Sequence, residues 1–188
     1  MLTHRLATEA DLPALKALMH RSIGELQRGF LSAAEIAASF GLMGLDTQLI
    51  ADRTYFLVEV DGVLAGCGGW SRRATLYGGD HTTSIRDPAL LDPAKDAARV
   101  RAMYTDPAFV RRGIGRLILS LCESAAAAAG FTRVQLAATL AGVPLYRACG
   151  YAEIECVAGG PVNGVPVPLV VMGKALVAPA PGSVFDHR

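Results

Sequence analysis

The sequence predicts a mixed α/β (α+β) domain whose central sheet is covered by helices on both faces. Three observations support this class. Apolar residues recur at helical spacing in the first quarter of the chain, a hairpin pattern follows at 55–70, and strand and helix patterns alternate over 99–172. At 188 residues the chain has the length of one domain, which we place at 1–177, with a flexible APAPGS-containing tail at 178–188.

The composition excludes several classes of protein. The 18 Lys and Arg residues balance 17 Asp and Glu residues, so bulk charge supports neither a nucleic-acid partner nor a membrane surface. The N-terminal stretch lacks the apolar core of a signal peptide, and no window approaches the roughly 20 apolar residues of a membrane span. The 4 cysteines form no C-x-x-C pair and no His-bracketed cluster, so we expect no metal site and reduced thiols in the cytoplasm.

Helix-start patterns predict the elements before the hairpin. A short strand at 3–7 leads to Thr8 and Asp11, which form a pattern like a capping box and start a helix with one apolar face. Ser32 and Glu35 repeat this start signal. The apolar residues expected after these starts are Leu12, Leu15, Leu18 and Met19, then Ile36 and Phe40, and finally Leu49 and Ile50 behind a cap at Thr47.

The strongest local signal is the β-hairpin at 55–70. The turn dipeptide Asp61-Gly62 joins two β-rich runs, which predicts a pair of antiparallel strands. The connection at 71–97 follows, and Gly78-Gly79 together with two Asp-Pro pairs leaves only short local structure in it. Connections of this length are uncommon in compact domains and are often functional.

The second half of the chain predicts a strand, a helix and further strands in succession. A strand at 99–105 stops at Asp106-Pro107, and a helix at 115–129 ends at a capping glycine, Gly130. The remaining predicted elements are a strand at 134–138, a short helix at 142–149, a strand at 151–157, a turn at 159–164 and a last strand at 167–172.

The stretch VRRGIGR at 110–116 has two interpretations. Gly113 and Gly115 remove side chains where a backbone can approach a ligand, and the following helix supplies free N–H groups and the positive end of its dipole, so the stretch has the features of a phosphate cradle. The other interpretation is a tight turn with solvated arginines. A dinucleotide fingerprint requires a third glycine where Ile118 stands, and a Walker loop requires a Lys and a Ser or Thr that this stretch lacks.

The run RAMYTDPAFVRRGIGRLIL and the later run ATLAGVPLYRACGY resemble the two core motifs of the GNAT superfamily of acyl-CoA-dependent N-acetyltransferases. The first resembles the family's R/Q-x-x-G-x-G/A pyrophosphate loop, with Val110 in place of the usual Arg or Gln. The second resembles the helix that ends in a tyrosine, here Tyr146, and the Gly-aromatic start of the next strand at Gly150-Tyr151. The opening RLATEADLPAL is also similar to the family's first strand and helix.

The resemblance implies a central mixed, mostly antiparallel sheet of about six to seven strands with a V-shaped splay between strands four and five. It implies acetyl-CoA as the acetyl donor, with the pantetheine arm in the splay and the diphosphate on the glycine loop. No metal is implied, because a thioester is already activated towards an amine. The residues implied in cofactor binding are Met103, Tyr104, Thr105, Arg111, Arg112, Gly113, Ile114, Gly115, Arg116 and Thr139.

The resemblance also assigns a catalytic role to Tyr146, as the acid that protonates the departing thiolate after direct attack by a neutral amine. Packing of its ring against the sheet is the alternative role. The base stays open among Tyr104, Glu25, His81 and a chain of waters.

The function implied is N-acetyltransfer from acetyl-CoA to a primary amine of a small acceptor. The alternative is a non-catalytic acyl-CoA sensor or interaction module of the same fold. The identity of the acceptor stays open. Arg72 and Arg73 either bind an acidic group of the acceptor or form a solvated pair at the end of a strand. We expect no nucleic-acid or membrane partner, and the resemblance allows a homodimer.

Overall fold

The computed structural model describes residues 1–177, and the predicted tail at 178–188 lies outside the described residues. The helices are α1 (Leu12–Leu26), α2 (Ala33–Leu42), α3 (Thr47–Ala51), α4 (Ile114–Ala128) and α5 (Val143–Ala148), with single 3₁₀ turns at η1 (Glu9–Asp11), η2 (Thr83–Ile85) and η3 (Pro107–Phe109). The strands are β1 (Leu2–Leu6), β2 (Tyr55–Val60), β3 (Val63–Ser71), β4 (Ala98–Thr105), β5 (Arg133–Thr139), β6 (Ala152–Val162) and β7 (Val165–Ala175).

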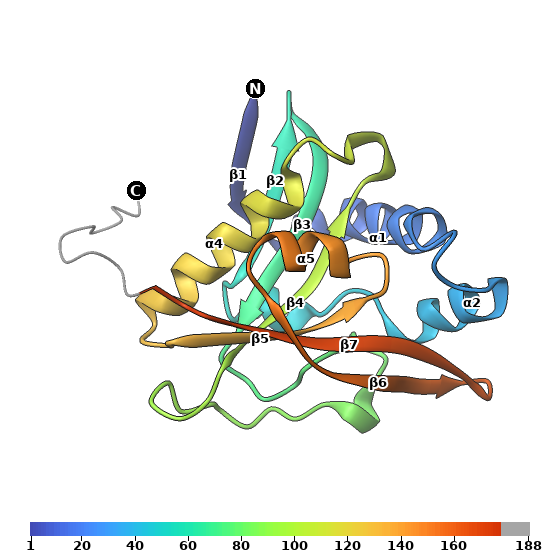
Figure 1. Ribbon diagram of the computed structural model, residues 1–188. Helices are drawn as coiled ribbons and strands as arrows, with labels where there is room; N and C mark the ends of the chain where they lie inside the picture. Colours follow the sequence, from blue (N-terminus) through green and yellow to red (C-terminus); the bar gives the residue numbers. More distant parts are fainter. Residues whose placement is uncertain (178–188) are drawn as a thin grey trace.

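The strands form one sheet in the order β1-β2-β3-β4-β5-β7-β6 (Figure 1). Every neighbouring pair is antiparallel except β4 and β5, which run parallel. The predicted class, a mixed and mostly antiparallel sheet between helices, is confirmed. Among residues 1–177, no helix combines the length and the apolar character that a membrane crossing needs.

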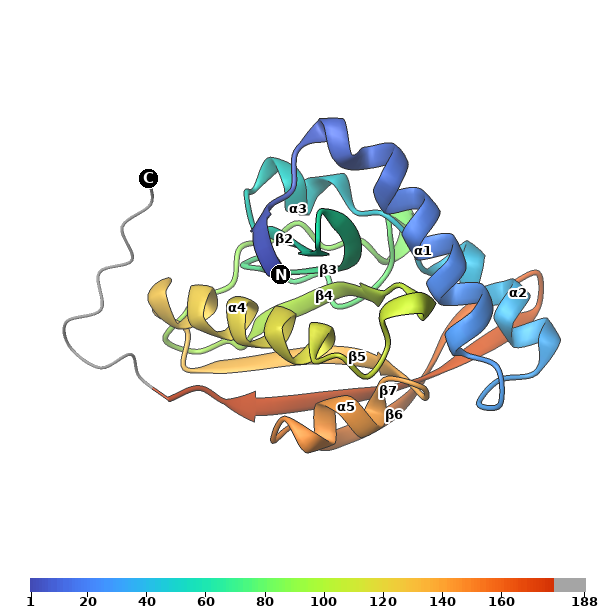
Figure 2. The ribbon, with the colours of Figure 1, turned by 90° about the horizontal axis from the view of Figure 1, so that it is seen from above.

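Helices cover both faces of the sheet, as Figure 2 shows from above. On one face α4 buries Ile114, Ile118 and Cys122 against β3, β4 and β5, and α5 adds Tyr146 to the same cluster. On the other face α1 and α3 pack on β2 and β3, and α2 packs on β7. The interior is thus divided by the sheet into separate apolar layers.

The parallel strands β4 and β5 splay apart. Their register contains only two pairs, Ala98 with Val134 and Arg99 with Gln135, although both strands continue beyond them. A bulge lies in β4 at this point, because Ala102 has a φ of 50° and the pairing of β3 with β4 shifts between Cys67 and Gly69. The expected V between strands four and five is confirmed.

Two tight turns have the geometry that their sequences favour. Asp61 and Gly62 have φ values of 50° and 78°, and Asn163 and Gly164 have φ values of 50° and 79°, so each pair suits a two-residue hairpin with both central residues in the left-handed region. The second hairpin corrects one sequence prediction. We expected a turn across 159–164, but β6 extends to Val162 because the turn needs only the Asn-Gly pair.

The helix boundaries differ from prediction by small amounts. The 115–129 helix begins one residue earlier, at Ile114, with Gly113 as its N-cap. The short helix α3 is capped by Asp46, whose side chain accepts from the N–H of Gln48, and not by Thr47. The capping box at Ser32 and Glu35 forms as predicted. The Asp46 carboxylate also accepts from Arg86 and Arg101.

Candidate active site

A cavity of about 620 Å³ opens where the sheet splays. Its walls come from α1, the end of β4, the loop before α4, and α5. Of the eleven residues predicted for the site, ten line this cavity. They are Met103, Tyr104, Thr105, Arg111, Gly113, Ile114, Gly115, Arg116, Thr139 and Tyr146.

The eleventh residue, Arg112, is not on the cavity wall. Its guanidinium carbon lies 5.3 Å from the centre of the Phe109 ring, which is a cation–π contact. The Arg112 side chain therefore packs on Phe109 of η3 and does not face the cavity. Arg111 and Arg116 are the two loop arginines on the wall.

The loop between η3 and α4 has a constrained backbone. Arg111 has a φ of 65° and Gly113 a φ of 81°, and the left-handed region is unfavourable for a residue such as arginine. Helix α4 begins directly after Gly113, and no side chain caps it. The first N–H groups of a helix have no acceptor within the helix, so the N–H groups of 114–116 are available at the cavity wall.

The two loop glycines have different structural roles. A Cβ atom placed on Gly113 would meet no heavy atom within 4 Å, so the space beside it is open. A Cβ atom on Gly115 would lie 2.7 Å from Leu145 Cδ2, so this glycine lets α4 pack closely against α5. Only Gly113 fits the interpretation of a side chain removed for a ligand.

An ion pair fixes the start of the loop to α1. The guanidinium of Arg21 donates to Asp106 Oδ2 through Nε at 3.0 Å and through Nη2 at 2.5 Å. Asp106 also accepts from the N–H of Ala108 and so caps η3. The side chain of Asp106 is 9 % exposed, and the pair joins α1 to the residue that follows β4, next to the cavity.

Two tyrosines stand at the splay. Tyr146 is 9 % exposed, and its ring packs edge-on against Tyr151 with centroids 5.9 Å apart. Burial raises the pKa of the Tyr146 hydroxyl, and burial also raises the pKa of Tyr104. The Tyr104 hydroxyl accepts from the N–H of Gly44 at 3.0 Å. Both phenols are therefore protonated at neutral pH and suit proton donation better than proton abstraction.

The sequence model of the acetyltransferase (GNAT) family matches residues 22–151 of this chain, which include the glycine loop, the splay and Tyr146. The match extends over more than half of the sequence. The chain belongs to the GNAT family.

Solved structures of GNAT proteins share the fold. One from Rhodopseudomonas palustris has a TM-score of 0.67 and 19% identity, covering 93% of this chain and 95% of that one. PaiA N-acetyltransferase from Thermoplasma acidophilum was solved in complex with coenzyme A. It has a TM-score of 0.63 and 13% identity, covering 93% of this chain and 99% of that one. Ribosomal-protein-S18-alanine N-acetyltransferase from Escherichia coli has a TM-score of 0.57 and 17% identity, covering 98% of this chain and 100% of that one. A search of curated proteins found no match.

The other candidate bases of this GNAT domain lie away from the cavity. Glu25 is exposed on α1, and His81 is exposed in the 71–97 connection; neither is on the wall. Arg73 is held by Asp52, with contacts of 2.7 Å and 2.9 Å, and Arg72 lies 5.6 Å from the centre of the Trp70 ring. Neither arginine lines the cavity, so the geometry supports neither as a group that receives the acceptor.

Gln27, at the end of α1, was missed in the sequence analysis. It is 3% exposed and lines the cavity, and its Oε1 atom is buried without a hydrogen-bond partner among residues 1–177. Its Nε2 atom lies 4.0 Å from Met43 Sδ, a weak contact. No sequence signal distinguishes this glutamine from a solvated residue at a helix end.

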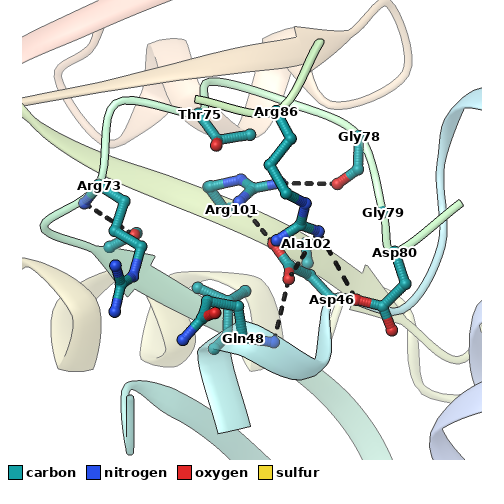
Figure 3. A network of polar contacts seen from close by, with 12 residues as sticks. Asp46, Gln48, Arg73, Thr75, Gly78, Gly79, Asp80, Arg86, Arg101 and Ala102 are labelled. Carbon is teal, nitrogen blue, oxygen red and sulfur yellow. Dashed lines mark hydrogen bonds and ion pairs between the residues drawn. The ribbon is translucent and has the colours of Figure 1, made fainter. Parts of the chain in front are cut away.

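A buried ion-pair network was also missed (Figure 3). Arg101 on β4 donates to Asp46 Oδ2 at 2.5 Å, and Arg86 donates to Asp46 Oδ1 at 3.1 Å. Arg86 also lies 3.6 Å from Asp80 Oδ1. The network fastens the 71–97 connection to β4 and to the start of α3. In the part of the chain that the structure describes, no group of three or more His, Cys, Asp or Glu side chains could hold a metal ion.

Proposed function

We propose that this GNAT protein is an N-acetyltransferase that transfers an acetyl group from acetyl-CoA to a primary amine of a small acceptor. The observation that carries the proposal is the glycine loop. Its left-handed residues and the free N–H groups of 114–116 border a large cavity at the splay. Backbone strain of this kind is commonly retained at ligand sites, and a helix N-terminus with such N–H groups binds phosphate.

The residues on the cavity wall fit this donor. The N–H groups of 114–116, with Arg111 and Arg116, would hold the diphosphate. Beyond Arg99, β4 has no pairing with β5, so the β5-side edge of 103–105 is available to the amides of the pantetheine arm. A side chain at Gly113 would occupy space that the ligand needs, while nothing in the protein fills it. The thioester supplies an acyl carbon that is already reactive towards an amine.

The proposed acid is Tyr146. The amine nitrogen bonds to the acyl carbon, the carbon–sulfur bond breaks, and the phenol gives its proton to the leaving sulfur. Burial raises the pKa of Tyr146, so the phenol carries its proton throughout the neutral range. The proposed scheme does not use Tyr104 as the base, because burial raises its pKa and its hydroxyl already accepts from the N–H of Gly44. The amine loses its proton to water in this scheme, and water returns a proton to the Tyr146 phenolate.

Tyr146→Phe tests the role of the hydroxyl. We expect turnover to fall by about 10²–10⁴-fold with unchanged affinity for CoA, the range typical of a general acid. Tyr151→Phe is the matched control, because the Tyr151 ring packs against Tyr146 but does not line the cavity. If both variants retain full turnover, the assignment of the acid is wrong. A folded protein that binds acetyl-CoA but acetylates no amine would support the sensor alternative.

The cytoplasm stays the predicted location, since all four cysteines carry free thiols, as is usual for proteins of that compartment.

A further inference from the structure

A second, smaller cavity of about 90 Å³ adjoins the first. Five residues line both cavities, namely Met43, Met103, Tyr104, Thr139 and Tyr146. The smaller cavity therefore begins at the two tyrosines. The 71–97 connection closes its far side with Leu76, Tyr77 and Gly78. This volume restricts an occupant to a small group of atoms.

Arg101 is the charged residue on this wall. It is 5% exposed, and its Nη1 and Nη2 atoms donate to Asp46 and to the carbonyl oxygen of Gly78, the latter at 2.6 Å (Figure 3). Its Nε atom is buried without a partner among residues 1–177. A buried donor of this kind is costly to leave unsatisfied.

The partners of the guanidinium leave one of its donors free beside the small cavity. The Nε–H and one N–H of Nη2 leave the planar group from the same edge. Nη2 donates to Gly78, which itself lines the small cavity. The free Nε–H thus belongs to a side chain on the wall of the small cavity, and it is a different donor from the Nη1 atom that pairs with Asp46.

The surrounding charges favour a neutral oxygen over an anion. Arg101 and Arg86 are balanced by Asp46 and Asp80, and the side chain of Asp46 is fully buried. A carboxylate entering this cavity would be an uncompensated buried charge beside Asp46, which is costly. A carbonyl oxygen satisfies the Nε–H without adding charge.

We infer that the small cavity binds the acceptor through a carbonyl oxygen on Arg101 Nε, and that the acceptor is an α-amino amide. This inference rests on the proposed function. The amine of such a compound is separated from its carbonyl oxygen by only two carbons, so it reaches the shared wall at Tyr104 and Tyr146 when the oxygen is on Arg101. A free amino acid is disfavoured because of its carboxylate.

The first test uses the wild-type protein and needs no turnover. Glycinamide, glycine and methylamine are titrated, in the presence of CoA, into protein labelled with ¹⁵N-arginine. We expect glycinamide to shift the Arg101 Nε–H resonance saturably, and glycine and methylamine to leave it in place at equal concentration. An unchanged resonance with glycinamide, or an equal shift with glycine, overturns the inference.

The second test compares acetylation of the same three amines. We expect kcat/KM, expressed per concentration of neutral amine, to be about tenfold higher for glycinamide than for glycine and methylamine, the scale of a hydrogen bond to a charged donor. Arg101→Lys keeps a cation beside Asp46 but removes Nε–H, and it should abolish this preference. Arg99→Lys on the same strand is the matched control, because Arg99 also has an unpartnered Nε but lines neither cavity.

The outcomes separate this inference from the proposed function. Acetyl-CoA binding with equal rates for glycinamide and methylamine overturns the small-cavity assignment alone. Absence of CoA binding overturns the proposed function, while the glycinamide titration without CoA still shows whether the cavity binds a carbonyl. If Arg101→Lys does not fold, the response of the Arg101 Nε–H resonance to glycinamide in the wild-type protein decides whether the inference holds.

Discussion

Replacing Gly113 and Gly115 in turn separates backbone strain from steric crowding in the glycine loop. Gly113 has a φ of 81°, and an added Cβ would meet nothing within 4 Å. The cost of Gly113→Ala is therefore only that of the left-handed conformation, about 1–2 kcal/mol of unfolding free energy. Gly115→Ala brings a Cβ to 2.7 Å from Leu145 Cδ2, and overpacking of this kind costs about 1–3 kcal/mol.

The expected losses of unfolding free energy for the two alanine variants overlap. Substitution by asparagine distinguishes backbone strain at Gly113 from steric crowding at Gly115. Asparagine tolerates the left-handed region, so Gly113→Asn should recover most of the stability lost in Gly113→Ala. At Gly115 the same residue adds bulk against Leu145 and should be worse than alanine. Urea unfolding of the four variants measures these differences. Equal losses for alanine and asparagine at Gly113 would refute the strain argument, and rescue by asparagine at Gly115 would refute the crowding argument.

Three further substitutions test other parts of the fold. Asp46→Ala leaves Arg101 buried without its counter-charge and should cost about 3–5 kcal/mol in urea unfolding; a loss below about 1 kcal/mol would contradict the buried pair. Ser32→Ala removes the cap of α2 and should cost about 1 kcal/mol, measured in the same way, whereas an unchanged midpoint would show that the cap adds nothing. The Arg5 guanidinium holds the pKa of Asp11 below its usual value, so this carboxylate stabilises the fold above about pH 3.9 and the contribution is lost as pH falls. Thermal unfolding of Asp11→Asn and wild type should differ at pH 7 and converge in strong acid; a gap independent of pH would refute the linkage.

Local features of this chain could be predicted from its sequence because their causes are local. The hairpin at Asp61-Gly62, the capping box at Ser32 and the glycine loop each depend on residues within a few positions of one another. Tyr146 and the predicted loop residues other than Arg112 also gather at one cavity, as the family resemblance implied. Their roles towards a ligand stay predictions.

Long-range features could not be predicted. The sequence predicts the cap of α3 at Thr47 and gives no sign of Asp46, whose pairing with Arg101 joins positions 55 residues apart. Arg101 lies on β4 beside the bulge at Ala102, and it is buried where the 71–97 connection crosses it, since Gly78 of that connection accepts from its Nη2. Gln27 faces the cavity only because α1 packs beside the splay. Positions such as these depend on tertiary packing, for which local pattern carries no signal.

Calorimetric titration of the folded protein with acetyl-CoA, CoA and NADH tests the central claim most directly. We predict saturable binding of acetyl-CoA and CoA and none of NADH, because the proposed function places the diphosphate of CoA on the loop, and the loop lacks the third glycine of a dinucleotide fingerprint. Absence of binding for both CoA compounds would contradict the account. The glycines would then only form a turn, and the proposed acetyl transfer, which depends on them, would be wrong.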